Sequence, residues 1–241
     1  MMRAPLFLQS MDRGTIIKIS CIALISVLLI AICVLAGEVY DECKREELME
    51  MFRMYYSEKV VMFKRENLEY AGVEVDAVFL GDSLTDGCDL SYYYPEIVAL
   101  NRGIGGDTTH GLLDRLEQSV FGVNTKVVVL LIGANNLKTM LDDYEDIVKT
   151  IKERIPQSKL IICSLTSMGG EWGRNNALAI ANNVQIEIIA KKYGCQFVDL
   201  FNPLLNKETG EIYEHYTSDG GHLTPDGYRV ITDCIKEVLY K

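Results

Sequence analysis

Two short motifs far apart in the chain contain residue types that are used in nucleophilic catalysis. Ser83 lies in the sequence Gly-Asp-Ser-Leu at residues 81–84, directly after a short apolar run. A serine hydroxyl becomes a nucleophile when a neighbouring base removes its proton. The sequence Asp-Gly-Gly-His at residues 219–222 offers such a base in His222, with Asp219 three residues earlier, where it can orient the imidazole ring.

Two further motifs can supply hydrogen-bond donors to a developing negative charge. Residues 101–109 form a glycine-rich turn before a predicted helix, and such a turn leaves backbone N–H groups free to face an anion. Residues 133–136, Gly-Ala-Asn-Asn, place the amide side chain of Asn135 after another apolar run. A nucleophile, a base with its orienting carboxylate and two kinds of oxyanion donor together predict acyl-transfer chemistry.

Two other kinds of site fit the sequence poorly. A dinucleotide site would need a third glycine at position 108, where Thr108 stands, and an acidic residue after the next strand. A metal site could use Asp142, Asp143 and Glu145, but acids in the first turn of a helix are favoured by its dipole alone. We therefore expect neither a cofactor nor a catalytic metal.

The four motifs follow the strands of an alternating pattern of elements. Short apolar runs predict buried strands at residues 76–80, 97–100, 126–132, 159–165 and 196–200. Helical patterns lie between them, at residues 108–120, 142–154, 175–193 and 225–240. This alternation predicts a three-layer α/β/α fold with a five-stranded parallel sheet. Ligands bind beyond the carboxyl ends of such strands, which is where the four motifs lie.

The four motifs, in this order along the chain, resemble the signature blocks of the SGNH hydrolases, also called GDSL esterases and lipases. The second block is similar to that of the platelet-activating-factor acetylhydrolase type, and the resemblance covers about residues 76–239. It implies a flavodoxin-like fold in which Ser83 attacks an ester carbonyl. His222 would be the general base and then the acid, and Asp219 would orient His222.

The resemblance also implies an oxyanion hole, formed by the backbone N–H groups of Ser83 and Gly106 and by the side-chain amide of Asn135. The third block of the family commonly ends in Asp, whereas Asn136 stands here. Asp82 and Asp107, which flank the catalytic positions, are predicted to hold the two turns by accepting backbone hydrogen bonds.

Two other histidines are weaker candidates for the base. His110 lies in the helix of the second block, and His215 follows Glu214. Neither has a carboxylate partner across a flexible Gly-Gly turn, as His222 does. We predict that His215 is a solvated loop residue.

The N-terminal region predicts a membrane anchor. Residues 19–36 are apolar apart from two serines, close to the roughly 20 residues that span a bilayer core. The preceding charged residues are Arg3, Asp12, Arg13 and Lys18. This positive bias predicts a cytoplasmic N-terminus and a catalytic domain on the other side of the membrane. A cleavable signal peptide, which would give a secreted protein, is the alternative, although its apolar region is usually shorter.

The chain is therefore predicted to have four parts. These are a cytoplasmic N-terminus at residues 1–18, the anchor at 19–36, a helical membrane-proximal segment at 37–72 and the hydrolase domain at 73–241. Residues 41–68 contain no Gly or Pro and predict a helix.

Composition excludes several classes of protein and partner. A chain with 49% hydrophobic and 24% charged residues fits a globular domain rather than a disordered or collagenous one. Its net charge of −10 disfavours nucleic acid as a partner. The seven cysteines form no Cys-x-x-Cys pair and are predicted to be small buried apolar residues.

Short connections between elements predict an open site for a small acyl group, such as acetyl. Side chains expected at the same edge of the sheet are Tyr92, Tyr93, Tyr94, Met168, Trp172 and Tyr216. Such aromatics can stack on a sugar or flank an acyl chain, although packing of the tyrosines in the core is equally expected. An acylated glycan or small-molecule ester is the expected substrate, with glycan deacetylation as the first hypothesis. The alternatives are a lysophospholipase-like lipid esterase, an acyltransferase using the same serine and a non-catalytic glycan-binding module.

Overall fold

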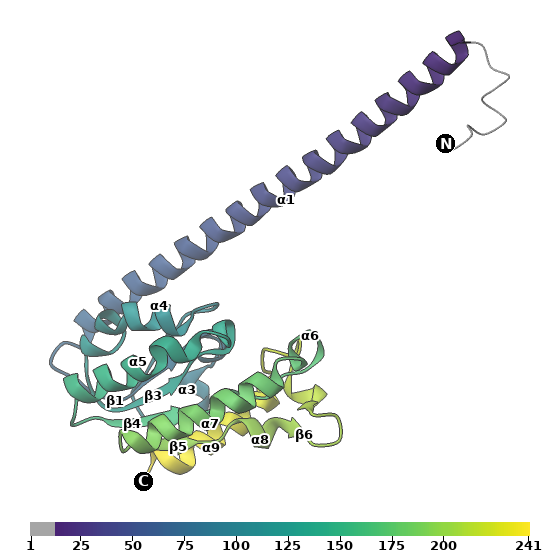
Figure 1. Ribbon diagram of the computed structural model, residues 1–241. Coiled ribbons are helices and arrows are strands. Elements are labelled where there is room, and N and C mark those ends of the chain that lie inside the picture. Colours follow the sequence, from purple (N-terminus) through teal and green to yellow (C-terminus); the bar gives the residue numbers. More distant parts are fainter. Residues whose placement is uncertain (1–12) are drawn as a thin grey trace. The chain divides into compact units, whose positions relative to one another are not determined.

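The computed structural model describes the backbone of residues 13–241 and the side chains of residues 38–241 (Figure 1). The chain forms two compact units, Met1–Met54 and Tyr55–Lys241. Helix α1 spans Arg13–Glu69, in agreement with the helix predicted over residues 41–68. Its last turns, from Tyr55 onward, thus belong to the second unit.

The second unit is built on the predicted five-stranded parallel sheet. The strands are β1 (Glu74–Gly81), β2 (Ala99–Gly103), β3 (Asn124–Leu131), β4 (Lys159–Cys163) and β5 (Gln196–Val198). Their order is β2-β1-β3-β4-β5, and every neighbouring pair is parallel. This is the order of flavodoxin-like sheets, in which the strand order reverses between β1 and β3.

The predicted long helices form with small shifts at their ends. The helices after α1 are α2 (Ser83–Asp86), α3 (Leu90–Tyr93), α4 (Thr109–Asp114), α5 (Met140–Arg154), α6 (Gly170–Gly173), α7 (Asn176–Lys192), α8 (Phe201–Leu204) and α9 (Pro225–Leu239). The helix predicted over residues 108–120 is interrupted: α4 ends at Asp114, and a π-helical turn follows at Glu117–Phe121. At the break, Arg115 turns its side chain into the interior.

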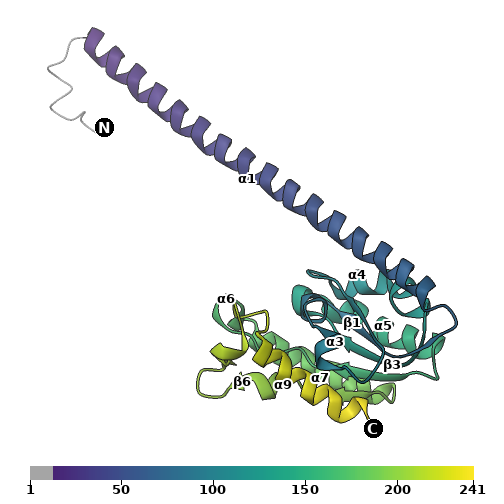
Figure 2. The same ribbon diagram turned by 180° about the vertical axis from the view of Figure 1, so that it is seen from behind.

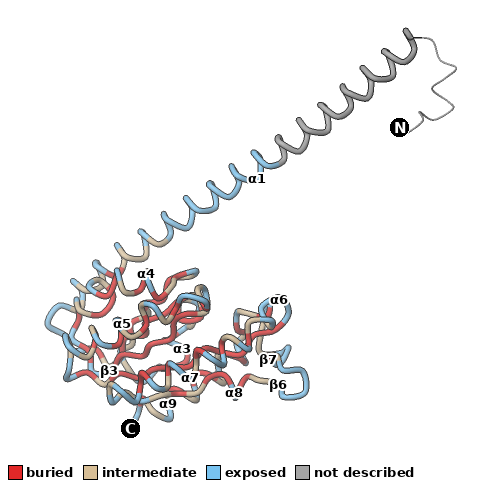
Figure 3. Tube along the Cα trace, in the orientation of Figure 1, coloured by how far each residue is buried: buried red, intermediate tan, exposed pale blue. Residues whose placement is uncertain are grey.

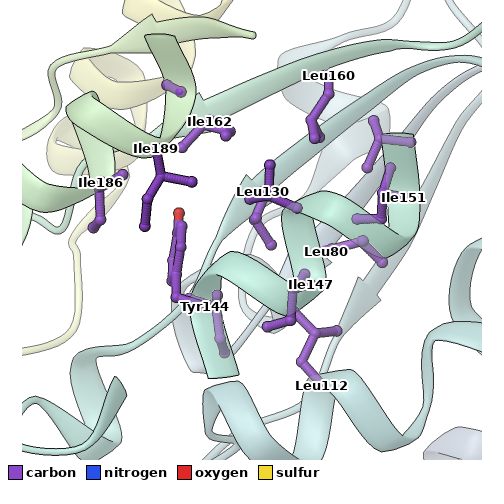
Figure 4. Close-up of a cluster of buried hydrophobic side chains, with 14 of the residues drawn as sticks. Leu80, Leu112, Leu130, Tyr144, Ile147, Ile151, Leu160, Ile162, Ile186 and Ile189 are labelled. Atoms are coloured by element: carbon purple, nitrogen blue, oxygen red, sulfur yellow. The ribbon is translucent and has the colours of Figure 1, made fainter. Parts of the chain in front are cut away.

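Helices cover both faces of the sheet (Figures 1 and 2). On one face, Leu80 and Leu130 pack with apolar residues of α4, α5 and α7, among them Ile147 and Ile186 (Figure 4). On the other, Phe79 packs with residues of α3 and α9. Successive strand residues point to opposite faces, so a strand covered on both faces needs the continuous apolar runs seen in the sequence. Figure 3 shows the resulting buried interior in red.

Several short elements were not predicted from the sequence, among them the helices α3, α6 and α8. A small antiparallel hairpin is formed by β6 (Leu205–Asn206) and β7 (Glu211–Ile212). Short 3₁₀ turns lie at Ala134–Asn136 and Glu214–Tyr216. All are too short to leave a periodic pattern in the sequence.

The predicted anchor lies outside the residues whose side chains are described. Within the described residues, no helix is long and apolar enough to cross a membrane. The anchor at residues 19–36 and the boundaries drawn around it thus stay predictions.

Two isoleucines of α7 test the packing of this helix on the sheet. Ile186 is fully buried, whereas Ile188 is 52% exposed. We expect Ile186→Ala to lower the free energy of unfolding by about 2 to 5 kcal/mol, because it leaves a cavity in the core. Ile188→Ala removes the same atoms from the surface and should cost less than about 1 kcal/mol. Urea denaturation measures both, and equal losses would show that α7 is packed otherwise.

Candidate active site

Ser83 lies at a tight turn between β1 and α2. Asp82 caps α2, its Oδ1 accepting a hydrogen bond from the Leu84 N–H at 3.1 Å. The turn requires glycine at position 81, because a Cβ there would lie 2.1 Å from the Thr85 Oγ1 and 2.3 Å from the Leu131 carbonyl oxygen. Ser83 is the first residue of α2, a position whose N–H has no partner within the helix. Within the described part of the chain this N–H makes no hydrogen bond.

The turn before α9 brings His222 to Ser83. The His222 Nε2 lies 3.1 Å from the Ser83 Oγ, and its Nδ1 lies 2.7 Å from the Asp219 Oδ2. The other oxygen of Asp219 accepts the N–H groups of Gly221 at 2.8 Å and His222 at 2.7 Å. Gly220, with φ of +90°, allows this reversal of the chain. The structure therefore joins the three residues predicted as a triad in one hydrogen-bonded chain.

Asp219 is held as a carboxylate by its surroundings. Partial burial raises its pKa, but hydrogen bonds from the backbone and ring of His222 and from the Gly221 N–H outweigh that effect and lower the pKa to about 2. An ionised Asp219 can only accept, so it selects the tautomer with the proton on Nδ1 of His222. The Nε2 lone pair then faces the Ser83 hydroxyl, as a general base requires.

Asn135 and Gly106 come from two neighbouring turns. Gly133, with φ of +124°, turns the chain from β3 so that Asn135 lines the same cleft as Ser83 and His222. The Asn135 Nδ2 donates one hydrogen to the Asp107 carbonyl at 2.8 Å, and its second hydrogen stays available to a ligand. Gly106, which precedes Asp107, is exposed with φ of +78°. It does not itself line the cleft, and within the described residues its N–H makes no hydrogen bond.

Asp107 has the structural role predicted for it. Its Oδ1 accepts from the Thr108 N–H at 2.8 Å, and its Oδ2 forms an ion pair with the Arg115 Nε at 2.7 Å. Arg115 is buried and also donates to the carbonyls of Gly81 and Arg102, both at 2.9 Å. Burial raises the pKa of Asp107, and the Arg115 guanidinium offsets part of that rise. The role of Arg115 was not predicted from the sequence, where it follows Asp114 and precedes Leu116 and Glu117 and so resembles an ordinary surface arginine.

Asn136 ties the Asn135 turn to α4. Its Oδ1 accepts from the Thr109 N–H at 3.3 Å, and its Nδ2 donates to the Thr109 Oγ1 at 2.9 Å. An amide both accepts and donates, which an ionised carboxylate cannot do. The departure from the family's usual Asp is therefore compatible with the same turn.

The cleft at Ser83 is small, about 40 Å³. Its lining residues are Asp82, Ser83, Leu84, Ala134, Asn135, Thr166, Met168, Trp172, Gly221 and His222. Of the aromatic and Met side chains expected here, Met168 and Trp172 line the cleft. Tyr93, the last residue of α3, and Tyr94, which follows it, are instead buried in the core cluster that contains Phe79 of β1 and apolar residues of α9.

The other two histidines lie apart from this hydrogen-bonded chain. His110 is exposed, and its ring nitrogens lie 3.6 Å from a carboxylate oxygen of Asp143 and 3.8 Å from one of Asp114. His215 is exposed, as predicted, with its ring 4.0 Å from that of Tyr216.

Comparison with known proteins places this arrangement in a family. The model of the GDSL-like lipase/acylhydrolase family matches residues 79–230. Platelet-activating factor acetylhydrolase IB subunit alpha2 from Rattus norvegicus and from Homo sapiens is 31% identical over 176 residues, or 69% of this chain and 76% of the relative.

Solved structures share the fold. A GDSL-like lipase from Bacteroides thetaiotaomicron has a TM-score of 0.64 at 24% identity, covering 74% of this chain and 97% of its own. The acetyl xylan esterase AlAXEase has a TM-score of 0.58 at 19% identity, covering 68% and 99%. The chain belongs to the GDSL-like lipase/acylhydrolase family, the SGNH hydrolases, and is an ester hydrolase, so the resemblance drawn from the four motifs is confirmed.

Like Asp107, Asp82 accepts a backbone hydrogen bond, as predicted. Unlike Asp107, it forms no ion pair with a cationic side chain among the described residues. It is 2% exposed. Burial is the largest influence and, with the charge of Asp107, raises the pKa of Asp82 to about 6, although backbone N–H groups such as that of Leu84 lower it in part. The folded protein thus binds the Asp82 proton more tightly than the unfolded chain does.

This difference predicts a pH-dependent stability. The stabilising contribution of protonated Asp82 is complete below about pH 4 and is lost as the pH rises through about 6. Asp82→Asn keeps an acceptor for the Leu84 N–H but cannot ionise. We expect its free energy of unfolding, relative to wild type, to rise by about 3 kcal/mol between about pH 4 and 7.5. Urea denaturation at both pH values measures this. Exposed Asp146→Asn is the control, and a constant difference for Asp82→Asn would contradict the assignment.

Proposed function

We propose that this protein is a serine esterase that hydrolyses short-chain acyl esters, such as acetyl esters. The observation that carries the proposal is the hydrogen-bonded chain from Asp219 through His222 to Ser83, which ends in a small open cleft. Ser83 is the nucleophile, His222 the general base and then acid, and Asp219 the residue that orients His222.

The reaction begins when the Ser83 Oγ attacks the ester carbonyl carbon and passes its proton to the His222 Nε2. The oxyanion that forms is held by the N–H groups of Ser83 and Gly106 and by the free Nδ2 hydrogen of Asn135. His222 returns the proton to the departing alcohol, which leaves an acyl group on Ser83. Water, deprotonated by His222, then attacks the acyl carbonyl carbon, the bond from that carbon to the Ser83 Oγ breaks, and His222 returns the proton to the Ser83 Oγ as the acid leaves.

The size of the cleft supports a short acyl group. The cleft beside Ser83 has a volume of about 40 Å³, and Leu84, Met168 and Trp172 are among its walls, so it suits a small acyl group better than a long chain. Two of the similar proteins are named for acetyl esters, an acetylhydrolase and an acetyl xylan esterase.

The alcohol part of the substrate would lie against Trp172, whose side chain lines the cleft and is 44% exposed. A partly exposed indole beside a reactive serine offers a stacking surface for a sugar ring. We therefore favour an acetylated glycan as substrate. The apolar residues 19–36 would anchor the enzyme in a membrane with its catalytic domain outside the cytoplasm.

Removal of the nucleophile tests the reaction class. We expect Ser83→Ala to abolish hydrolysis of p-nitrophenyl acetate and butyrate with little change in melting temperature, because the hydroxyl reacts but packs against little. His222→Ala should have the same effect, since the base and the nucleophile act as one unit. Wild type should turn over acetate and butyrate faster than octanoate and palmitate.

Other results would redirect the assignment. Preference for octanoate or palmitate would favour a lipid esterase. No turnover of any of the four esters by folded wild type would contradict the esterase, and acyl transfer or glycan binding would then be measured.

Removal of one proposed oxyanion donor, the Asn135 amide, should lower the turnover rate by a predictable factor. We expect Asn135→Ala to lower kcat by about 100-fold to 1000-fold with a small change in KM, because the donor is used mainly in the transition state. Steady-state kinetics with p-nitrophenyl acetate measures the effect. Lys138→Ala, an exposed change on the same loop, should leave kcat unchanged. Full activity of Asn135→Ala would remove Asn135 from the oxyanion hole.

A further inference from the structure

The last turns of α1 contact the parts of the domain that shape the oxyanion turn. The contacting side chains, on one face of the helix, are Tyr55, Tyr56, Lys59, Phe63, Glu66 and Asn67. Positions three and four apart on a helix share a face, so this spacing gives one continuous contact row. Near its upstream end the row meets α2 and α4, and further along it meets β2.

Asp86, the last residue of α2, lies where this row reaches the active site. Its Oδ1 accepts from the Lys59 Nζ at 2.6 Å, and its Oδ2 accepts from the Tyr55 hydroxyl. The same Oδ2 accepts from the Gly105 N–H at 3.0 Å. One carboxylate therefore connects α1 to the N–H of Gly105, the residue before Gly106.

The chemistry of Tyr55 keeps this connection intact. Partial burial, then the hydrogen bond to Asp86 and the charge of Asp86, raise the pKa of Tyr55 to about 12. The phenol therefore stays protonated and donates throughout the physiological pH range. A Cβ at Gly105 would lie 3.5 Å from the Asp86 Oδ2 and 3.7 Å from the Tyr55 Cε1, so the turn also packs against both side chains.

The turn at residues 104–107 is held at each of its other N–H groups. The Ile104 N–H donates to the Gly81 carbonyl and the Asp107 N–H to the Ile104 carbonyl, both at 3.1 Å. The Gly105 N–H is held by Asp86. The Gly106 N–H is left for a ligand. The hydrogen bond from the Asp107 N–H to the Ile104 carbonyl closes a turn over Gly105 and Gly106, and the Asp86 carboxylate holds the N–H at the start of that turn. Together these two hydrogen bonds restrict the rotation of the peptide group that carries the Gly106 N–H.

We propose that Asp86, itself held by Tyr55 and Lys59, is a positioning residue that aims the Gly106 N–H at the oxyanion. The end of α1 is then part of the catalytic apparatus rather than only a connection to the N-terminal segment. This inference rests on the proposed esterase function and on the place of Gly106 in its oxyanion hole.

A positioning role and a purely structural one differ in what they change. If Asp86 only attached α1 to the domain, its loss would lower stability and leave each folded molecule fully active. The pair of Arg102 with Glu66 and the hydrogen bond from Asn67 to the Gln118 carbonyl also hold the helix. Variants at Tyr55 and Lys59 should therefore keep α1 in place.

The test compares kinetic constants of the full chain, residues 1–241. Asp86→Asn offers one acceptor oxygen where the carboxylate offers two, so at least one of its three donors loses its partner. Tyr55→Phe combined with Lys59→Met removes both supports from α1 and leaves Asp86 unchanged. Lys64→Met, at an exposed position of the same helix, is the matched control. A fluorophosphonate, which reacts with an activated serine, is used to titrate the fraction of chains with a functional Ser83. The kcat of each variant for p-nitrophenyl acetate is divided by this fraction.

We expect Asp86→Asn to lower kcat about 10-fold to 100-fold, with KM changed less than about 2-fold, because a misdirected donor weakens only transition-state binding. The double variant should lower kcat by about 3-fold to 10-fold, and Lys64→Met should match wild type. If Asp86→Asn does not fold, the double variant tests the positioning role in its place, again by a lower kcat with little change in KM.

Two failures are distinguishable. An inactive wild type, or a Ser83→Ala variant as active as wild type, would overturn the proposed function itself. Normal kcat per labelled site in Asp86→Asn and in the double variant, beside an inactive Ser83→Ala variant, would leave the esterase standing and overturn the positioning role.

Discussion

One buried guanidinium links the turn that carries Ser83 to the turn that carries Gly106. Arg115 forms an ion pair with Asp107, directly after Gly106, and donates to the Gly81 carbonyl, two residues before Ser83. A buried charge is costly unless it is paired and hydrogen-bonded, so the interior tolerates Arg115 only while these partners stay in place. A change in the distance between the Ser83 turn and the Gly106 turn would therefore break partners of Arg115 and destabilise the domain.

Asp82 shows what happens to a buried carboxylate without such a partner. It has backbone donors only, and burial raises its pKa to about 6, whereas Asp107 has the Arg115 guanidinium. In contrast, Asp219 lies half exposed and accepts three hydrogen bonds within its own turn. The scaffold of the site is buried, while the groups proposed to move protons lie at the surface, where substrate and water reach them.

Much of this arrangement could be predicted because it depends on local sequence. Strands buried on both faces leave apolar runs, and Ser83 and His222 lie in turns whose glycines and caps are visible in the sequence. Arg115 could not be predicted, since a charged residue near a helix end normally faces water and only tertiary partners reverse that preference. For the tyrosines at positions 92–94 the sequence left two places open, the active-site edge and the core, and the contact of Tyr94 with Phe79 of β1, a tertiary contact, puts Tyr94 in the core.

In the proposed reaction, specificity must arise outside the four motifs, since within them backbone hydrogen bonds and glycine turns already hold Ser83, Asn135 and His222 in place. The wall of the cleft opposite Asn135 comes from the segment between β4 and α7, through Thr166, Met168 and Trp172. Thr166 and Met168 are buried there, whereas Trp172 lies on the four-residue helix α6 between two glycines. In the proposed reaction, the buried Thr166 and Met168 would border the acyl group and the exposed Trp172 would border the alcohol, so the alcohol could vary without disturbing Ser83. Substitutions at Trp172 would thus change which alcohol is accepted more than they change the chemical step.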